Sequence, residues 1–256
     1  MTTNVQQLFS SAQQDGTLGA QSMQVLAVPD LGAQIALGLG IAIDDVKASE
    51  VVLVTLMPDD SGSIRMAKNA QNVRDGHNAV LDALLASKQK DNVFVHTRYL
   101  NGDVLFPYVP LAQAIRMDSQ NYDPNQGTPL YDQSVVLLGT VLAKTQAFLD
   151  AGVNVRTVTL LITDGADAGS NRAQPKDVAA IVKDMTMAER HIVAAMGIDD
   201  GGTDFRQVFS LMGIDPRWVL TPKNNQKEIR RAFNVFSQSA VQMTGGGGAG
   251  GFAAVP

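Results

Sequence analysis

Continuous apolar runs of strand length recur along this chain and alternate with stretches whose apolar residues fall at helical spacing. The run Val51–Met57 contains only apolar residues and one threonine, which is typical of a strand buried on both faces of a parallel sheet. We expect it to be the central strand. Further strands are expected at 93–100, 104–109, 155–163, 191–198 and 218–220.

Apolar residues at three- and four-residue spacing predict helices between these strands. A single long helix is expected from Ser63, with an inner stripe made of Met66, Ala67, Ala70, Val73, His77, Val80, Leu81, Leu84 and Leu85. A second stripe after Pro129 comprises Leu130, Ser134, Leu137, Leu138, Val141, Thr145, Phe148 and Leu149. Further helices are expected from Pro175, over 203–212 and over 226–243.

The fold class follows from the order of these elements. Asn101-Gly102 is a strong hairpin signal, so the strand over 104–109 should lie antiparallel at an edge. The other strands alternate with helices. The sequence therefore predicts an α/β fold, doubly wound, with a mostly parallel sheet and one antiparallel edge strand.

Three parts are distinguishable along the chain. Residues 1–47 are an N-terminal extension expected to pack on or near the domain, residues 48–243 the domain itself, and residues 244–256 a Gly-rich tail expected to be disordered. In the extension, 4–14 predicts a short amphipathic helix. The segments 23–28 and 34–43 are interpreted as added strands or as an irregular cover on the sheet edge.

Composition narrows the functional classes. The net charge is −5 and the pI is near 5.1, whereas nucleic-acid-binding domains usually carry a basic surface, so nucleic-acid binding is not expected. There are no cysteines, which excludes thiolate metal sites, and three scattered histidines make a zinc site poor. The first residues do not resemble a signal peptide, and the longest apolar stretch, 31–43, is too short to cross a bilayer. We expect a cytoplasmic protein with no nucleic-acid or membrane partner.

Oxygen-bearing side chains stand where the predicted strands end. Asp59-Asp60-Ser61-Gly62-Ser63 follows the central strand directly, Asp164 ends the strand over 155–163, and Thr128 precedes the second long helix. Ligands of open α/β sheets bind at the carboxyl ends of the strands, and oxygen donors suit hard cations such as Mg²⁺. A metal site built by three loops is the first hypothesis.

The pattern Asp-x-Ser-x-Ser with a distant Thr and a distant Asp resembles the metal-ion-dependent adhesion site (MIDAS) of von Willebrand factor type A (vWA) domains. All five positions are matched, by Asp59, Ser61, Ser63, Thr128 and Asp164, and the resemblance covers about residues 48–243. It implies a Rossmann-like vWA fold that binds Mg²⁺ or Mn²⁺. It also implies that the three hydroxyls bind the ion directly and that the two aspartates act largely through water. An Asp or Glu of a protein partner would complete the coordination.

Each of these residues also has an ordinary structural interpretation. Ser63 and Thr128 suit helix caps, with Pro129 at the first helical position, and Asp59 and Asp164 stand in turn sequences. Their joint order and context favour the metal site.

Neighbouring residues are assigned lesser roles. We expect Asp60 to be a solvated turn residue, and His77, His96 and His191 to be structural. The acidic stretch 199–204 is interpreted as a turn before a Thr-capped helix. Tyr122 and the loop 166–173 are weaker candidates for partner contact.

The leading functional hypothesis is a metal-dependent interaction module or adaptor without enzyme activity. Intracellular members of the resembled family often act in larger assemblies, including with AAA-type ATPases, so such an assembly is one expected partner. The alternative is a Mg²⁺-dependent phosphoryl-transfer or hydrolytic enzyme, which usually needs a positioned cation, and only Arg172 stands in these loops. A third hypothesis is a self-associating scaffold, in which an acidic side chain of one copy completes the metal site of the next.

Overall fold

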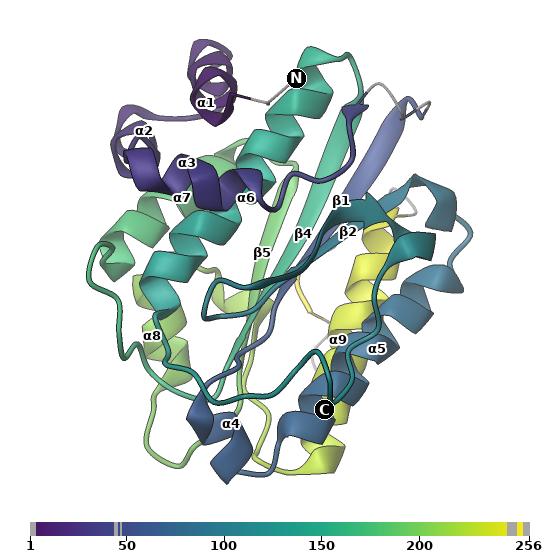
Figure 1. Ribbon diagram of the computed structural model, residues 1–256, viewed down its shortest axis with the longest axis vertical. Coiled ribbons are helices and arrows are strands. Elements are labelled where there is room, and N and C mark those ends of the chain that lie inside the picture. Colours follow the sequence, from purple (N-terminus) through teal and green to yellow (C-terminus); the bar gives the residue numbers. More distant parts are fainter. Residues whose placement is uncertain (1–3, 44–45, 47, 245–249, 253–256) are drawn as a thin grey trace.

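The computed structural model describes residues 4–43, 46, 48–244 and 250–252 and contains a six-stranded sheet between two layers of helices (Figure 1). The sheet order is β3-β2-β1-β4-β5-β6, and every neighbouring pair is parallel except β2 and β3. The strands are β1 (Glu50–Met57), β2 (Val93–Arg98), β3 (Val104–Pro110), β4 (Asn154–Thr163), β5 (His191–Gly197) and β6 (Val219–Leu220). This confirms the predicted doubly wound sheet with one antiparallel edge strand.

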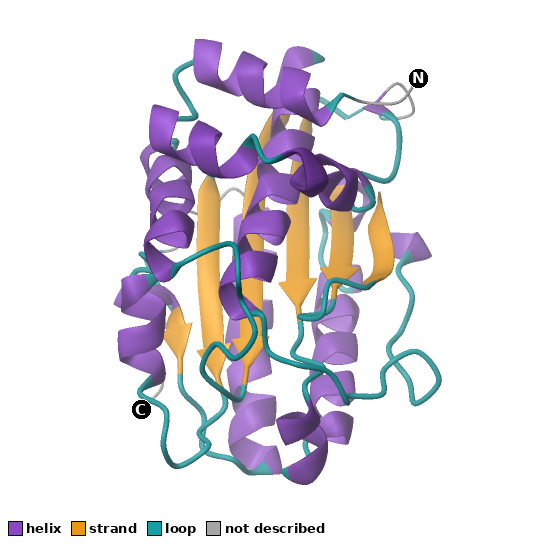
Figure 2. Ribbon diagram, turned by 60° about the vertical axis from the view of Figure 1, so that its left-hand side comes forward, coloured by secondary structure: helices purple, strands orange, loops and turns teal. Residues whose placement is uncertain are grey.

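The central strand is the one that the apolar pattern predicts. β1 pairs with β2 on one side and with β4 on the other, and all of its residues after Glu50 are buried. Met57 lies opposite Leu161, near the carboxyl end of β4. The loops that follow β1 and β4 therefore leave the sheet side by side, at the edge where the arrows of the parallel strands end in Figure 2.

Helices cover both faces of the sheet. α5 (Ala70–Leu85) and α9 (Gln226–Thr244) pack against each other on one face, and α6 (Leu130–Asp150) and α7 (Pro175–Met187) lie on the other. The shorter elements are α4 (Gly62–Met66), α8 (Phe205–Leu211), η2 (Lys90–Asn92), η3 (Leu111–Gln113) and η4 (Pro216–Trp218). None of the described helices is long and apolar enough to cross a membrane.

The expected single helix after Ser63 is wrong, because two helices form there. α4 ends at Met66, Lys68 adopts a left-handed conformation with φ 61°, and α5 begins at Ala70. A residue in the left-handed region is a common way to end a helix. Met66, which the periodic stripe places inside, is consequently 79% exposed on α4. The spacing of the apolar residues thus predicted that this region is helical, but it did not predict the interruption between α4 and α5.

Three helices form within the described part of the N-terminal extension. The predicted helix over 4–14 is confirmed as α1 (Val5–Gln14), whose Asn4 side chain caps the N–H groups of the first turn. The strand interpretation of 23–28 is wrong, since α2 (Ala20–Leu26) and α3 (Pro29–Ala36) form there. These helices pack on the outer side of α6 and α7 and so bury faces of α6 that the predicted stripe leaves exposed, including Val135, Val136 and Leu142.

The residues after α3 confirm the alternative of an irregular cover on the sheet edge. The Tyr108 N–H of β3 donates to the Gly38 carbonyl at 2.9 Å, and the Ile41 N–H donates to the Tyr108 carbonyl at 2.9 Å. Gly40 between them has φ 59°, and a Cβ there would lie 2.0 Å from the Tyr108 carbonyl oxygen. Lys144 of α6 also donates to the Ile41 carbonyl. The chain itself thereby covers the outer edge of β3 at Tyr108.

The tail expected to be disordered falls mostly outside the described residues, which omit 245–249 and 253–256. Gly250–Phe252, in contrast, contact η4. The turn over 199–204 is confirmed, but the helix after it is capped by Asp204 rather than by Thr203. The Asp204 side chain accepts from the Gln207 N–H, whereas the Thr203 hydroxyl donates to Asp200.

Candidate metal centre at the carboxyl ends of β1 and β4

Asp59 is the buried centre of the loop that follows β1. Its Oδ1 accepts the Ser61 N–H at 2.7 Å, and its Oδ2 accepts the Thr163 hydroxyl at 2.7 Å and the Asp164 N–H at 3.3 Å. Asp59 is fully buried. Its carboxylate therefore joins the ends of β1 and β4, which are neighbours in the sheet.

Two serines and the second aspartate form a continuous chain of oxygen atoms. The Ser61 and Ser63 hydroxyls lie 2.8 Å apart, and the Ser63 hydroxyl donates to Asp164 Oδ1 at 2.5 Å. Four of the five predicted ligands, Asp59 among them, are thus joined through direct hydrogen bonds. The structure brings these four together as the strand-end argument predicts.

Short bridges tie the loop of Thr128 to the other two loops. Ser61 pairs in parallel with Gln126, and the Gly62 N–H donates to the Gln126 carbonyl at 3.0 Å. Thr128 pairs antiparallel with Ala168 through hydrogen bonds of 3.3 and 2.9 Å. The Thr128 loop is therefore joined on one side to the loop after β1 and on the other to the loop after β4.

The expected capping role of Thr128 is wrong. Pro129 is the N-cap of α6, and the helix begins at Leu130, one residue later than predicted. The backbone of Thr128 is committed to its bridge with Ala168, so it cannot enter the helix. Ser63 is no cap either, because it lies inside α4. Neither Thr128 nor Ser63 is therefore a helix cap, which was the structural alternative to metal binding for these two hydroxyls.

The first turn of α6 and the loop after β4 cap each other instead. The Ser170 hydroxyl accepts the N–H groups of Tyr131 and Asp132 at 3.1 and 3.0 Å, and it donates to Asp167 at 2.5 Å. In return the Asp132 carboxylate accepts three N–H groups from 171–173. This exchange stiffens two of the three loops. Only the Asp-x-x-Ser spacing of 167 and 170, which is common in turns, hints at it in the sequence.

Tyr122 and Asp60 differ from expectation because both are buried. Tyr122 is 1% exposed, and its hydroxyl donates to the Asp59 carbonyl, so it supports the loop and is not a contact for a partner. Asp60 is 4% exposed, accepts the Asn101 N–H at 3.0 Å, and is not solvated. The exposed residues of the loop 166–173 remain candidates for partner contact.

Three carboxyl groups share this buried region. Burial raises the pKa of Asp59, and burial with repulsion from Asp59 raises the pKa of Asp164 to about 6 and that of Asp60 to about 7. Hydrogen bonds to each group oppose these shifts only in part. Within the described ranges, none of the three forms an ion pair. The protein leaves their negative charge uncompensated, and a bound cation would compensate it.

The donor set fits a hard divalent cation. The described residues contain no group of three or more His, Cys, Asp or Glu side chains arranged to hold a metal, so a carboxylate cage or a zinc site is not formed there. The available donors are the hydroxyls of Ser61 and Ser63 and the carboxylates behind them, while Thr128 stands on the loop that the backbone bridges tie to theirs. All are oxygen atoms, as Mg²⁺ and Mn²⁺ prefer.

The three histidines are structural, as predicted. His77 bonds the Thr97 hydroxyl at 2.9 Å, His96 bonds the Phe106 carbonyl at 2.7 Å, and His191 bonds the Thr157 hydroxyl at 2.8 Å. Burial lowers the pKa of His77 to about 4 and those of the other two to about 3, so all three stay neutral near pH 7. None is hydrogen-bonded to the candidate metal ligands.

Comparison with solved structures agrees with this architecture, whereas no protein-family model and no curated protein matches the sequence. The pilus adhesin SpaC from Lactobacillus rhamnosus GG superposes with a TM-score of 0.53 at 15% identity, covering 78% of this chain and 31% of that one. Proximal thread matrix protein 1 from the mussel byssus gives 0.50 at 16% identity, covering 76% and 47%. The SpRpn10 VWA domain gives 0.47 at 9% identity, covering 72% and 94%.

The chain spans less than half the length of the first two of these structures, and at such low identity the likeness bears on the fold alone. The sheet order, the single antiparallel edge strand and the helices on both faces agree with it. The chain has a doubly wound, Rossmann-like α/β fold, similar to the matched parts of SpaC and proximal thread matrix protein 1.

Proposed function

We propose that this chain is a divalent-metal-dependent protein-interaction module that binds a carboxylate of its partner through Mg²⁺ or Mn²⁺. The observation that carries the proposal is the hydrogen-bonded chain Ser61–Ser63–Asp164, which joins the loops of two neighbouring strands. Ser61, Ser63 and Thr128 would hold the ion, with Asp59 and Asp164 behind them. When bound, the ion supplies a positive charge with an open coordination position, which an Asp or Glu of a partner can occupy.

The surface around the site suits a partner protein. Met66 projects from α4 three residues after Ser63 and is 79% exposed, which is unusual for a large apolar side chain. Ala168 and Gly169 of the loop after β4 are also exposed, and Ala168 pairs with Thr128. A partner that places a carboxylate at the site would meet these apolar groups beside it.

The arrangement favours binding over phosphoryl transfer or hydrolysis. Arg65 of α4 donates to the Pro124 carbonyl at 2.7 Å and pairs with Asp123 at 2.8 Å, while Arg172 lies 3.6 Å from Asp30. These two arginines thus face partners of their own. Phosphoryl transfer usually requires a cation aimed at the developing charge. We therefore infer a non-enzymatic adaptor.

We propose the partner as a class of protein, defined by an Asp or Glu that it presents to the metal. A cytoplasmic protein that presents an Asp or Glu is the first expectation, and an AAA-type ATPase assembly is one such setting. Self-association is the alternative, in which a second copy supplies the carboxylate. The two differ in their dependence on protein concentration.

Calorimetric titration with Mg²⁺ and Mn²⁺ tests whether the chain binds a divalent ion at the proposed site. Thr128→Ala is the site variant, and Thr203→Ala is the matched control. Thr203 also has a hydroxyl next to a carboxylate, Asp200, but on another loop. We expect one ion per wild-type chain, at least tenfold weaker binding by Thr128→Ala, and wild-type binding by Thr203→Ala. Equal binding by all three proteins would contradict the proposed ligands, and no binding by the wild type would reject the function.

Partner capture then tests the role of the metal. Immobilised wild type should retain its partner from the native source in Mg²⁺ and lose it in chelator, and Thr128→Ala should fail in both. Sizing at increasing concentration, with and without chelator, detects self-association. A phosphatase assay with Mg²⁺ addresses the enzymatic alternative, and turnover that Asp59→Ala abolishes would overturn the non-enzymatic proposal.

A further inference from the structure

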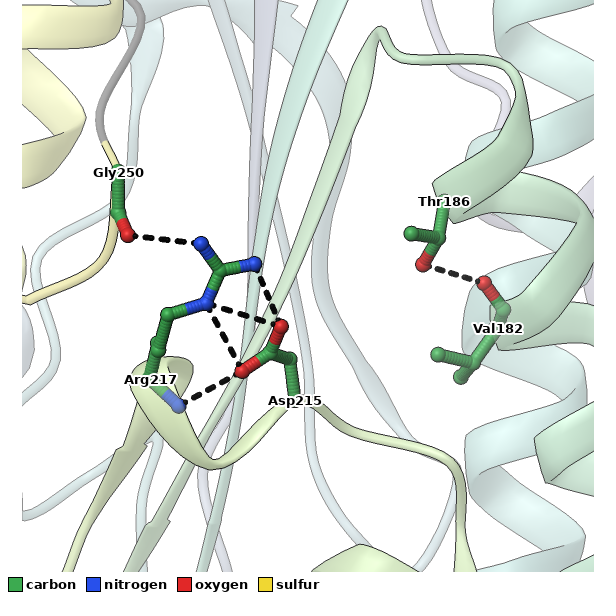
Figure 3. Close-up of polar contacts among 5 residues, drawn as sticks. All are labelled: Val182, Thr186, Asp215, Arg217 and Gly250. Carbon is green, nitrogen blue, oxygen red and sulfur yellow. Dashed lines mark hydrogen bonds and ion pairs between the residues drawn. The ribbon is translucent and has the colours of Figure 1, made fainter.

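The C-terminal residues Gly250–Phe252 return to the sheet and lie against η4, which directly precedes the edge strand β6. The Phe252 N–H donates to the Arg217 carbonyl at 2.9 Å. Arg217 Nη1 donates to the Gly250 carbonyl at 3.2 Å, and Figure 3 shows this second bond. The rings of Phe252 and Trp218 meet edge to face, with centroids 5.1 Å apart and an interplanar angle of 79°. Three different contacts thus hold a three-residue segment.

The receiving surface is ordered by its own contacts. The Asp215 carboxylate accepts Arg217 Nε at 3.0 and 3.1 Å, Nη2 at 2.6 Å and the Arg217 N–H at 2.9 Å, as Figure 3 shows. The Trp218 N–H donates to the Asp215 carbonyl at 2.8 Å. These bonds aim the remaining guanidinium nitrogen, Nη1, at Gly250. A fork held in this way loses little freedom when it binds a carbonyl.

The three positions of the segment differ in which residues they can accept. Gly251 has φ 138°, and a Cβ there would lie 2.9 Å from Arg217 Cβ, so this position requires glycine. Gly250 has open space where its Cβ would be, so other residues fit there. Phe252 supplies the aromatic edge that Trp218 receives. The surface therefore selects a glycine followed by an aromatic residue.

We propose that η4 and Trp218 form a docking site for a Gly-aromatic motif, and that the chain's own Gly251-Phe252 fills it as a removable cover. Because only three weak contacts hold the segment, we expect a free peptide with the same motif to bind with a Kd on the order of millimolar. The segment and the site belong to one chain, so docking is intramolecular, with an effective concentration on the order of millimolar, and the segment closes the site yet can be displaced. β6 is two strands away from β4 in the sheet, so docking should not depend on the metal site.

Trp218 is the only tryptophan of the chain, so its fluorescence reports the site without an added label. We expect Phe252→Ala and Gly251→Ala to raise acrylamide quenching of Trp218 at least twofold. Gly250→Ala is the matched control and should behave as wild type. All variants should melt within a few degrees of wild type, because only a few contacts hold the segment. Unchanged quenching in Phe252→Ala, or equal quenching in the two glycine variants, would overturn the proposal.

A second experiment adds a free peptide to test whether the site recognises the motif. Gly-Gly-Phe-Ala-Ala-Val-Pro, the sequence of 250–256, should reverse the quenching of the Phe252→Ala protein at millimolar concentration. The same peptide with alanine in place of phenylalanine should have no effect. Equal action of both peptides would show that no motif is recognised and would reject the site. The response should be the same in Mg²⁺ and in chelator, and a response that chelator abolishes would contradict its independence from the metal.

Discussion

The Ser63 hydroxyl donates a 2.5 Å hydrogen bond to Asp164 Oδ1, although the two residues are separated by 101 positions in the chain. They meet because β1 and β4 are parallel neighbours whose carboxyl ends open at the same edge of the sheet. A hydroxyl held between another hydroxyl and a carboxylate is a ready oxygen donor for a cation.

Ser63→Ala tests this relationship directly. The substitution removes the middle oxygen of the chain, so we expect Mn²⁺ affinity to fall at least tenfold. Ser63 is only half-buried, and its hydrogen bond should contribute about 1 kcal/mol to the free energy of unfolding. Calorimetry and thermal melting measure the two effects. Ser10→Ala, which removes an exposed helical hydroxyl bonded to the Gln6 carbonyl, should change neither. Intact metal binding by Ser63→Ala would exclude it as a ligand.

Asp60→Asn should stabilise the metal-free protein in a pH-dependent way. Burial raises the pKa of Asp60 from 3.8 to about 7, so its ionisation is less favourable in the folded than in the unfolded chain. The resulting destabilisation is absent below about pH 4, grows as pH rises, and is complete above about pH 7. Asparagine keeps the acceptor for the Asn101 N–H but carries no charge. We expect a gain on the order of 1–3 kcal/mol at pH 8 and none at pH 4.

Denaturant unfolding across this pH range in chelator measures the Asp60 effect. Asp91→Asn, at an exposed position, controls for the general change in net charge. A gain for Asp60→Asn that is the same at pH 4 and pH 8 would show that the carboxyl group is not the cause.

Metal affinity should fall as the solution becomes acidic. Burial raises the pKa of Asp164 to about 6 and also raises that of Asp59, so protons compete with the cation for this site. We expect constant affinity above about pH 7 and a loss approaching tenfold per pH unit below about pH 6 for each proton displaced. Mn²⁺ titrations between pH 5 and pH 8 measure this. Asp164→Asn should bind more weakly and with a flatter pH dependence, and an unchanged slope would assign the proton to another group.

Gly40→Ala should destabilise the protein strongly. Gly40 has φ 59°, and a Cβ there would lie 2.0 Å from the Tyr108 carbonyl oxygen, so both the backbone and the cover on β3 must shift. The unfavourable backbone conformation alone costs about 1–3 kcal/mol. Gly32→Ala in α3 is the matched control, because its Cβ meets no atom within 4 Å and alanine favours a helix by about 0.5–1 kcal/mol.

Denaturant unfolding of the two glycine variants gives the stability difference, and light scattering reports exposure of the β3 edge. Aggregation of Gly40→Ala but not of Gly32→Ala would follow from an uncovered edge strand. Equal stability of the two variants would contradict the close approach at Gly40.

Local sequence determined the strands of the sheet, most of the helices between them and the position of the candidate site. An apolar run such as Val51–Met57 has few alternatives to a buried central strand, and Asn101-Gly102 specifies a hairpin through its backbone preference. Asp59 and Asp164 directly follow strands, so their meeting required only that the strands be parallel neighbours. For these residues, distance along the chain mattered less than position relative to a strand end.

Tertiary structure alone decided what covers each element and which polar group supports the site. Periodicity shows that α6 has an apolar face, but not that the N-terminal helices bury its other side. The bond from Tyr122 to the Asp59 carbonyl and the capping of α6 by Ser170 join distant segments, and no local spacing shows which segments will meet. The contact of Phe252 with Trp218 is of the same kind. Such contacts depend on where distant segments come to lie, because each isolated segment is compatible with many partners and only the packed chain selects one.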